Sequence, residues 1–145
     1  MIKIRKTDIT ELNTLMDIFE QGKHIMRKDG NMKQWTGGYP TEEIIKKDIE
    51  NGNSYVCLDE EQNIVGTFAF IQGNDPTYVQ IYNGEWIDDI RPYGVIHRLA
   101  STEDSKGIAS ACLQWCYRQI PIAIIISCNI SSRNTASNIA ASSTC

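Results

Sequence analysis

The sequence predicts an α/β protein built on one mixed sheet, and three observations support this. Apolar residues recur at helical spacing over 9–19 and 44–49, and the spacing changes to two over 54–71. A further strand pattern, 93–101, leads directly into a helical pattern, 107–119. Helices before a run of strands, followed by one strand-to-helix crossover, indicate a mixed sheet flanked by helices. The length of 145 residues fits a single domain.

The first third of the chain is predicted to form an edge strand and two helices. Residues 1–5 alternate, as in a short strand. Thr7 or Asp8 can cap the helix that follows, and Gly22 is expected to end it. A polar segment, 23–38, precedes the second helix, which begins at Thr41 and ends near Gly52.

The remainder is predicted to hold strands and one more helix, giving the order β-α-α-β-β-β-α-β. The first two of these strands are joined by a charged turn, and the extended piece after them is short. The predicted strands are 54–58, 64–71, 93–101 and 120–126, the short extended piece is 78–82, and the helix is 107–119.

Composition excludes several classes of protein. A net charge of −4 argues against a nucleic-acid binder, which would show a basic stripe. No apolar run reaches the roughly 18 residues of a membrane span, and the basic N-terminus lacks the apolar region of a signal peptide. We therefore expect a cytoplasmic protein without a membrane partner. Of the five cysteines only Cys112 and Cys116 are close together, with no histidine nearby, so buried thiols are expected rather than a metal site.

The most informative segment joins the strand ending at Ser101 to the helix after it. The first N–H groups of a helix lack internal partners and lie at the positive end of its dipole. Gly107 and Ala109 would let a phosphate approach this backbone, and Lys106 adds a cation. Without further evidence, such a pattern is more often close packing at a helix start than an anion site.

The sequence HRLAS, followed shortly by KGIASACLQWC, resembles the acetyl-CoA motif of the GNAT superfamily of N-acetyltransferases. The resemblance implies the GNAT fold and acetyl-CoA as co-substrate, with no metal. It implies that Leu99, Ala100 and Ser101 border the pantetheine arm. The residues that would surround the pyrophosphate are Ser105, Lys106, Gly107, Ile108, Ala109 and Ser110. Asp104 departs from the motif, which has glutamine or arginine there.

The resemblance implies a bacterial enzyme that transfers the acetyl group to a primary amine of a small molecule or a protein, with a homodimer as the expected assembly. Candidate general bases are Glu85, Asp88 and His97. An intrinsic pKa of about 6.5 suits His97 to the task, although a buried core histidine is the favoured interpretation. Aromatic residues expected near the acceptor, as lids or as contacts, are Trp35, Tyr39, Trp86 and Tyr93.

Two other functions stay open. A GNAT-shaped module that holds CoA with impaired catalysis is favoured by Asp104 and by the absence of the tyrosine that the family often carries near its C-terminus. An unrelated α/β domain, in which the turn around Gly107 only packs, would bind no CoA.

The C-terminal segment does not fit the pattern of residues 1–127. Residues 128–145 are almost wholly Ser, Asn, Ala and Thr, a composition typical of disorder. Codons for 119–145, read with a one-base offset, can yield DTHCDNHLMQHIEQEYGFQYCGIIYV, which resembles the closing helix and strands of a GNAT domain. We therefore hypothesise a frameshift near residues 119–121, which leaves the domain truncated after the motif helix and followed by an out-of-frame tail.

Overall fold

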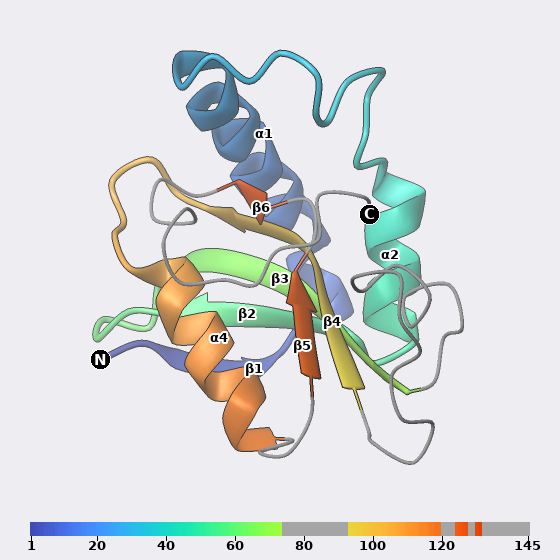
Figure 1. Ribbon diagram of the computed structural model, residues 1–145, viewed down its shortest axis with the longest axis vertical. Coiled ribbons are helices and arrows are strands. Elements are labelled where there is room, and N and C mark those ends of the chain that lie inside the picture. The colour runs from blue at the N-terminus through green and yellow to red at the C-terminus, as the bar shows by residue number, and fades with distance from the viewer. Residues whose placement is uncertain (74–92, 120–123, 128–129, 132–145) are drawn as a thin grey trace.

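The structure is a computed structural model that describes residues 1–73, 93–119, 124–127 and 130–131. In this part of the chain six strands form one sheet, with the order β1-β2-β3-β4-β5 and with β6 also beside β4 (Figure 1). The elements are β1 (Lys3–Lys6), the 3-10 turn η1 (Ile9–Glu11), α1 (Leu12–Lys28), α2 (Glu42–Glu50), β2 (Ser54–Leu58), β3 (Ile64–Gly73), β4 (Tyr93–Ser101), α4 (Ile108–Gln119), β5 (Ile124–Ser127) and β6 (Ile130–Ser131).

The sheet is mixed, as the sequence predicts. β1 to β4 pair antiparallel in order, whereas β4 pairs parallel with both β5 and β6. In Figure 1, α4 covers one face of the sheet and α1 and α2 lie behind the other. The resulting arrangement, with helices on both faces of a mostly antiparallel sheet, agrees with the predicted fold class. The predicted extended piece 78–82 lies outside the described residues.

Each face of the sheet buries its own apolar cluster. Alternate residues along β2 point to opposite sides, because successive side chains of a strand alternate. Tyr55 and Cys57 pack with α4, whereas Val56 and Leu58 pack with α1 and α2. The α4 cluster is rich in aromatic rings, and in it the rings of Tyr55 and Phe68 stack with centroids 5.4 Å apart.

Helix α1 is longer than predicted, and the expectation that Gly22 ends it is wrong. The helix continues to Lys28 because Ile25 and Met26 extend its apolar stripe, and both are buried. Gly22 is itself buried in the helix. Its role as a stop signal is therefore overridden by packing, which contributes more than the roughly 1 kcal/mol that glycine costs within a helix.

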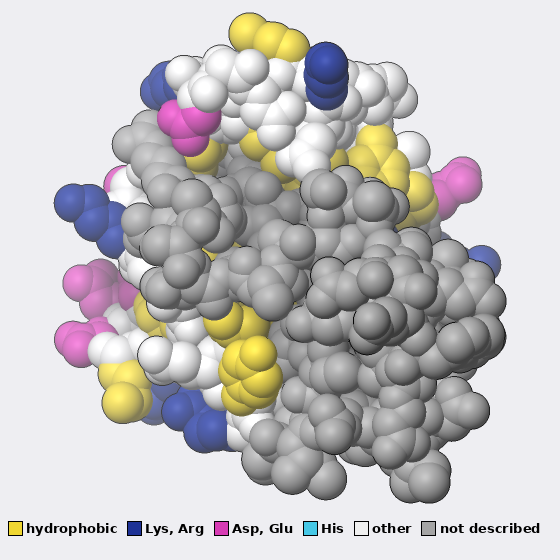
Figure 2. Space-filling model, viewed as in Figure 1, with side chains coloured by type: hydrophobic (Ala, Val, Ile, Leu, Met, Phe, Trp, Pro, Cys, Tyr) yellow, Lys and Arg dark blue, Asp and Glu magenta, His cyan; other side chains and the backbone are white. Residues whose placement is uncertain are grey.

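The described surface mixes charges of both signs. Figure 2 shows lysine, arginine and acidic side chains interspersed around one face, with hydrophobic side chains among them. No described helix has the length and apolar character that crossing a bilayer requires.

Gly66 on β3 marks a close approach between the sheet and α4. A Cβ built at this position would lie 2.7 Å from Ile108 Cγ2 and 3.2 Å from the Ala100 carbonyl oxygen. Contacts this short force a neighbour to move. We expect Gly66→Ala to lower the free energy of unfolding by about 1–3 kcal/mol, measured by urea denaturation.

A double-mutant cycle with Ile108→Ala isolates this contact. If the methyl group of Gly66→Ala meets Ile108, the two substitutions together destabilise the protein less than the sum of the single effects. Strict additivity, or a neutral Gly66→Ala, would show that the two elements are not in such close contact.

Candidate functional site: the junction of β4 and α4

The junction between β4 and α4 is a short, internally hydrogen-bonded turn. The backbone N–H of Ser105 and its hydroxyl both donate to the carbonyl of Thr102, at 3.3 and 2.9 Å. The Thr102 N–H donates to the carbonyl of Val65 on β3, at 3.0 Å. These bonds hold residues 102–105 against the end of the sheet, so that α4 begins at a fixed place beside it.

Gly107 precedes the helix with its backbone in the left-handed region, at φ 72°. A Cβ built on it meets no atom of the described residues within 4 Å, so within that part of the chain the space beside this backbone is open. The side chains of Ile108 and Ala109, in contrast, are almost fully buried in the core. The first turn of α4 therefore anchors its side chains in the protein and leaves room beside Gly107, where the helix dipole favours an anion.

Polar side chains of α1, on the other face of the sheet, contact the turn between β4 and α4. The backbone N–H of Glu103 donates to Gln21 Oε1 at 3.1 Å. The Glu103 carboxylate lies 3.4 Å from His24 Nδ1 and 3.5 Å from Lys28 Nζ. Since these partners hold Glu103, the turn is fixed at its start as well as at α4. Asp104, the departure from the expected motif, is exposed.

Strand β4 contains a bulge centred on Arg98. Thr67 and Ala69 of β3 lie opposite Ala100 and His97, so β4 carries one residue more than β3 over this stretch. Arg98 has φ 49°, a backbone conformation that side chains other than glycine rarely adopt. Such strained backbone persists only where surrounding contacts hold it.

The bulge directs the Arg98 side chain to α2. In a regular strand Arg98 would share the face of Ile96, which belongs to the apolar α4 cluster. Instead its Nε and Nη2 donate to the two carboxylate oxygens of Asp48, at 2.8 and 2.7 Å, and its Nη1 donates to the Tyr39 hydroxyl at 3.3 Å. Burial acts against the guanidinium charge, but the hydrogen bonds to Asp48 and Tyr39 outweigh it, so the pKa of Arg98 is raised.

The proposed acceptor and catalytic residues are not all brought together in the described residues. His97 is buried, with 6% of its surface exposed. Trp35 is buried too and packs edge-on against Phe19, with centroids 5.6 Å apart. Tyr39 is half-buried beside Arg98. Glu85, Trp86 and Asp88 lie outside the described residues, as does the side chain of Tyr93, whose backbone begins β4.

Asp48 and Arg98 were not singled out by the sequence interpretation. Arg98 lies within the HRLAS segment, but the alternation of side chains in a strand predicts only which face of the sheet it occupies. Asp48 is one of several acidic residues on a short helix. Their pairing across 50 positions of the chain leaves no local signal in the sequence.

β6 lies against the segment of β4 that the sequence assigns to the cofactor. Leu99 pairs with Ile130 and Ala100 with Ser131 in a parallel ladder. β5 pairs with the N-terminal half of β4, from Tyr93 to Ile96. Part of the tail beyond residue 127 therefore joins the sheet next to Leu99 and Ala100.

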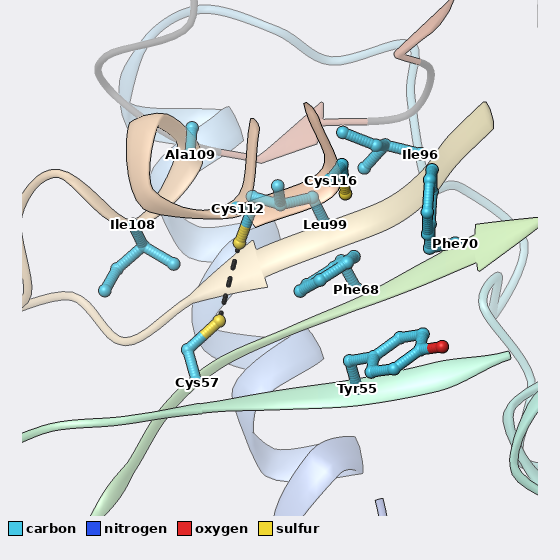
Figure 3. Packing of buried hydrophobic residues seen from close by; sticks show 10 residues of the cluster. All are labelled: Tyr55, Cys57, Phe68, Phe70, Ile96, Leu99, Ile108, Ala109, Cys112 and Cys116. Atoms are coloured by element: carbon cyan, nitrogen blue, oxygen red, sulfur yellow. Dashed lines mark hydrogen bonds between the residues drawn. The ribbon is translucent and has the colours of Figure 1, made fainter. Parts of the chain in front are cut away.

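The described cysteines are free and buried, as the sequence predicts for thiols in a core. Cys57 on β2 and Cys112 on α4 lie with their sulfur atoms 3.4 Å apart (Figure 3). Cys116 belongs to the same cluster. Burial raises the pKa of the Cys112 thiol, and the hydrogen bond with Cys57 raises it further. The described residues contain no group of three or more side chains suited to hold a metal ion.

Several solved structures that resemble this chain are of acetyltransferases. A GNAT-family acetyltransferase from Streptococcus agalactiae is 29% identical, with a TM-score of 0.69, over 81% of this chain and 69% of that one. The chain has the GNAT fold. Its other structural neighbours include a GNAT-family acetyltransferase from Listeria monocytogenes, 12% identical with a TM-score of 0.63, over 86% of this chain and 74% of that one.

A third structure with this fold was solved with acetyl-CoA bound. It is a predicted acetyltransferase from Clostridium acetobutylicum solved with acetyl-CoA, 17% identical with a TM-score of 0.51, over 92% of this chain and 82% of that one. No protein-family model matches the chain, and no curated protein does either. The GNAT fold confirms the resemblance stated from HRLAS and KGIASACLQWC and places these residues at the junction of β4 and α4.

Proposed function

We propose that this protein is an N-acetyltransferase, which transfers the acetyl group of acetyl-CoA to a primary amine of a small molecule or a protein. The observation that carries the proposal is the open space beside Gly107 at the start of α4, within a GNAT fold. Because Gly107 has no side chain, a phosphate would fit in the space that the Cβ of any other residue at this position would occupy. The neighbouring structure solved with acetyl-CoA supports the same co-substrate.

The chain's own residues supply binding and orientation. The backbone of 105–110, with the exposed Lys106 beside it, would hold the pyrophosphate, since helix N-termini favour anions. Leu99, Ala100 and Ser101 would border the pantetheine arm and direct the thioester toward the bulge of β4. The reaction forms a bond from the amine nitrogen to the acetyl carbon and breaks the carbon–sulfur bond. The amine loses a proton, and the thiolate of CoA takes one up.

Of the candidate general bases, His97 is the one that lies within the described residues. It would accept the proton of the amine directly or through a water. Its burial favours the alternative role of a core histidine. Glu85 and Asp88 stay predictions, as do acceptor contacts from Trp35, Tyr39, Trp86 and Tyr93.

The release of CoA thiol with a panel of primary amines tests this function. We expect thiol release that depends on both acetyl-CoA and an amine, with a mass increase of one acetyl group on the amine. Tight binding of acetyl-CoA without transfer to any amine would instead favour a CoA-binding module. Absence of binding would contradict both functions.

A CoA-binding module with impaired transfer is the second candidate, and one observation favours it. β6 pairs with β4 at Leu99 and Ala100, the edge at which the pantetheine arm is expected. The two cannot occupy this edge together, so the tail would compete with the co-substrate.

Substitution at Ile130 tests this competition. Ile130→Pro removes a backbone donor and disfavours pairing with β4, so acetyl-CoA should bind about fivefold more tightly, the equivalent of roughly 1 kcal/mol. Ile130→Ala keeps the backbone donor and serves as the control, with unchanged affinity in calorimetric titration. Equal affinities of both variants and the parent chain would show that β6 does not compete.

The frameshift and the homodimer remain predictions. The DNA sequence across codons 119–121, together with the intact mass of the protein from its own gene, tests the frameshift. A mass near 16.4 kDa would show that the tail beyond residue 127 is part of the protein. Light scattering of the purified protein tests the homodimer.

A further inference from the structure

The one strained non-glycine residue on a described strand is Arg98. It lies in β4 one position before Leu99, where the sequence expects the pantetheine arm. If the pyrophosphate lies at 105–110 and the arm runs back along Ser101 and Leu99, the thioester comes next to the bulge. This placement rests on the proposed acetyltransferase function.

A bulge interrupts the regular ladder between neighbouring strands and redirects the backbone groups around it. Here it lies between Ala100 and His97, and the register with β3 is regular again from Ala69 onward. The direction of the backbone N–H groups at this point is therefore set by the local conformation of β4. A carbonyl that develops negative charge needs such donors held in place before the reaction.

The contacts of Arg98 are of the kind that fix geometry. Two of its nitrogens engage both oxygens of one carboxylate, a bidentate arrangement that sets direction as well as distance. The side chains of Arg98 and Asp48 are 12% and 13% exposed, so the pair is largely shielded from water and salt. Asp48 lies on α2, a rigid element that packs on the sheet through Ile45.

The third contact reaches the segment between α1 and α2. Arg98 Nη1 donates to the hydroxyl of Tyr39, two residues before Thr41 caps α2. Tyr39 is one of the aromatic residues expected near the acceptor amine. The guanidinium therefore connects the strand assigned to the acetyl donor with the segment assigned to the acceptor.

We propose that Arg98 is a positioning residue for acetyl transfer, which holds the bulge of β4 in place through Asp48 and aligns it with the acceptor side through Tyr39. Arg98 itself does not touch the reacting atoms. Its loss should disturb the alignment of donor and acceptor while the pyrophosphate site, seven or more positions further along the chain, stays intact.

The test compares Asp48→Asn and Arg98→Lys with the parent enzyme. Both variants keep the size of the side chain approximately, but neither keeps the bidentate pair. We expect kcat to fall about tenfold to 100-fold, the range that a misplacement of about 1 Å produces. The Kd for acetyl-CoA should stay within about threefold of the parent value, measured by calorimetry, and kcat is expressed per acetyl-CoA-binding site.

A second arginine–carboxylate pair provides the control. Arg5 on β1 donates to both oxygens of Glu11, at 3.0 and 2.7 Å, at the far edge of the sheet from β4. Arg5→Lys disrupts this pair in the same way and should leave kcat unchanged.

The outcomes separate the positioning role from the proposed function. A parent chain that transfers acetyl to no amine would overturn the proposed function and, with it, this role. An active parent whose Asp48→Asn and Arg98→Lys variants keep their kcat would overturn the positioning role alone. A parallel loss of kcat and acetyl-CoA affinity, per folded molecule, would assign the pair to general stability and also overturn the role.

Discussion

Gly107→Asp is expected to weaken acetyl-CoA binding at least tenfold, or about 1.4 kcal/mol. The substitution places a negative charge in the open space beside the first turn of α4, where the proposed function puts the pyrophosphate. Two like charges about 4 Å apart repel by more than about 1.4 kcal/mol when water is partly excluded from between them. Calorimetric titration of the full chain with acetyl-CoA measures the effect.

Gly107→Asn is the matched control, because it has nearly the same shape and no charge. Both residues tolerate the left-handed backbone at φ 72° better than most others do. The difference between the two variants therefore reports the charge, and it should shrink as salt is added. Equal affinities for the two variants would place the phosphates elsewhere.

Phe68→Ala is expected to produce the largest loss of stability, about 3–5 kcal/mol. Phe68 is 1% exposed on β3 and stacks on Tyr55, and its ring centroid lies 6.0 Å from that of Trp115 on α4. Its removal leaves a cavity between the sheet and the helix. Urea denaturation should show a lower midpoint with an unchanged slope.

Tyr117→Ala is the control for this substitution. Tyr117 is an aromatic residue of the same α4 region, but it is 42% exposed. Its removal should change stability by less than about 0.5 kcal/mol. A loss at Tyr117 comparable to that at Phe68 would mean that α4 does not pack as described.

Local periodicity was sufficient to predict most of the fold. The strand 93–101 and the strand 54–58 have the predicted limits, and α4 begins one residue after the predicted start. These elements follow rules of alternation and capping that act over a few neighbouring residues. Gly22 misled the prediction of α1, because a local stop signal competes there with burial against a sheet formed much later in the chain.

The turn that forms the candidate site was predictable from a short motif, whereas contacts between distant residues were not. Gly107 and Ala109 stand in one motif, and the turn around them is built from neighbouring bonds. Arg98 and Asp48 meet only because β4 and α2 pack in three dimensions. A bulge also adds no distinctive residue here, since neither glycine nor proline stands at 98.

The bulge of β4 has a consequence for which changes in chain length this protein tolerates. Ile96 and Leu99 both face α4, although they are three positions apart and a regular strand would place them on opposite sides. Deleting one residue between them would leave Ile96 and Leu99 two positions apart, so a regular strand would still place both against α4. A shortened β4 should therefore keep its core contacts while it loses the bulge that turns Arg98 toward Asp48.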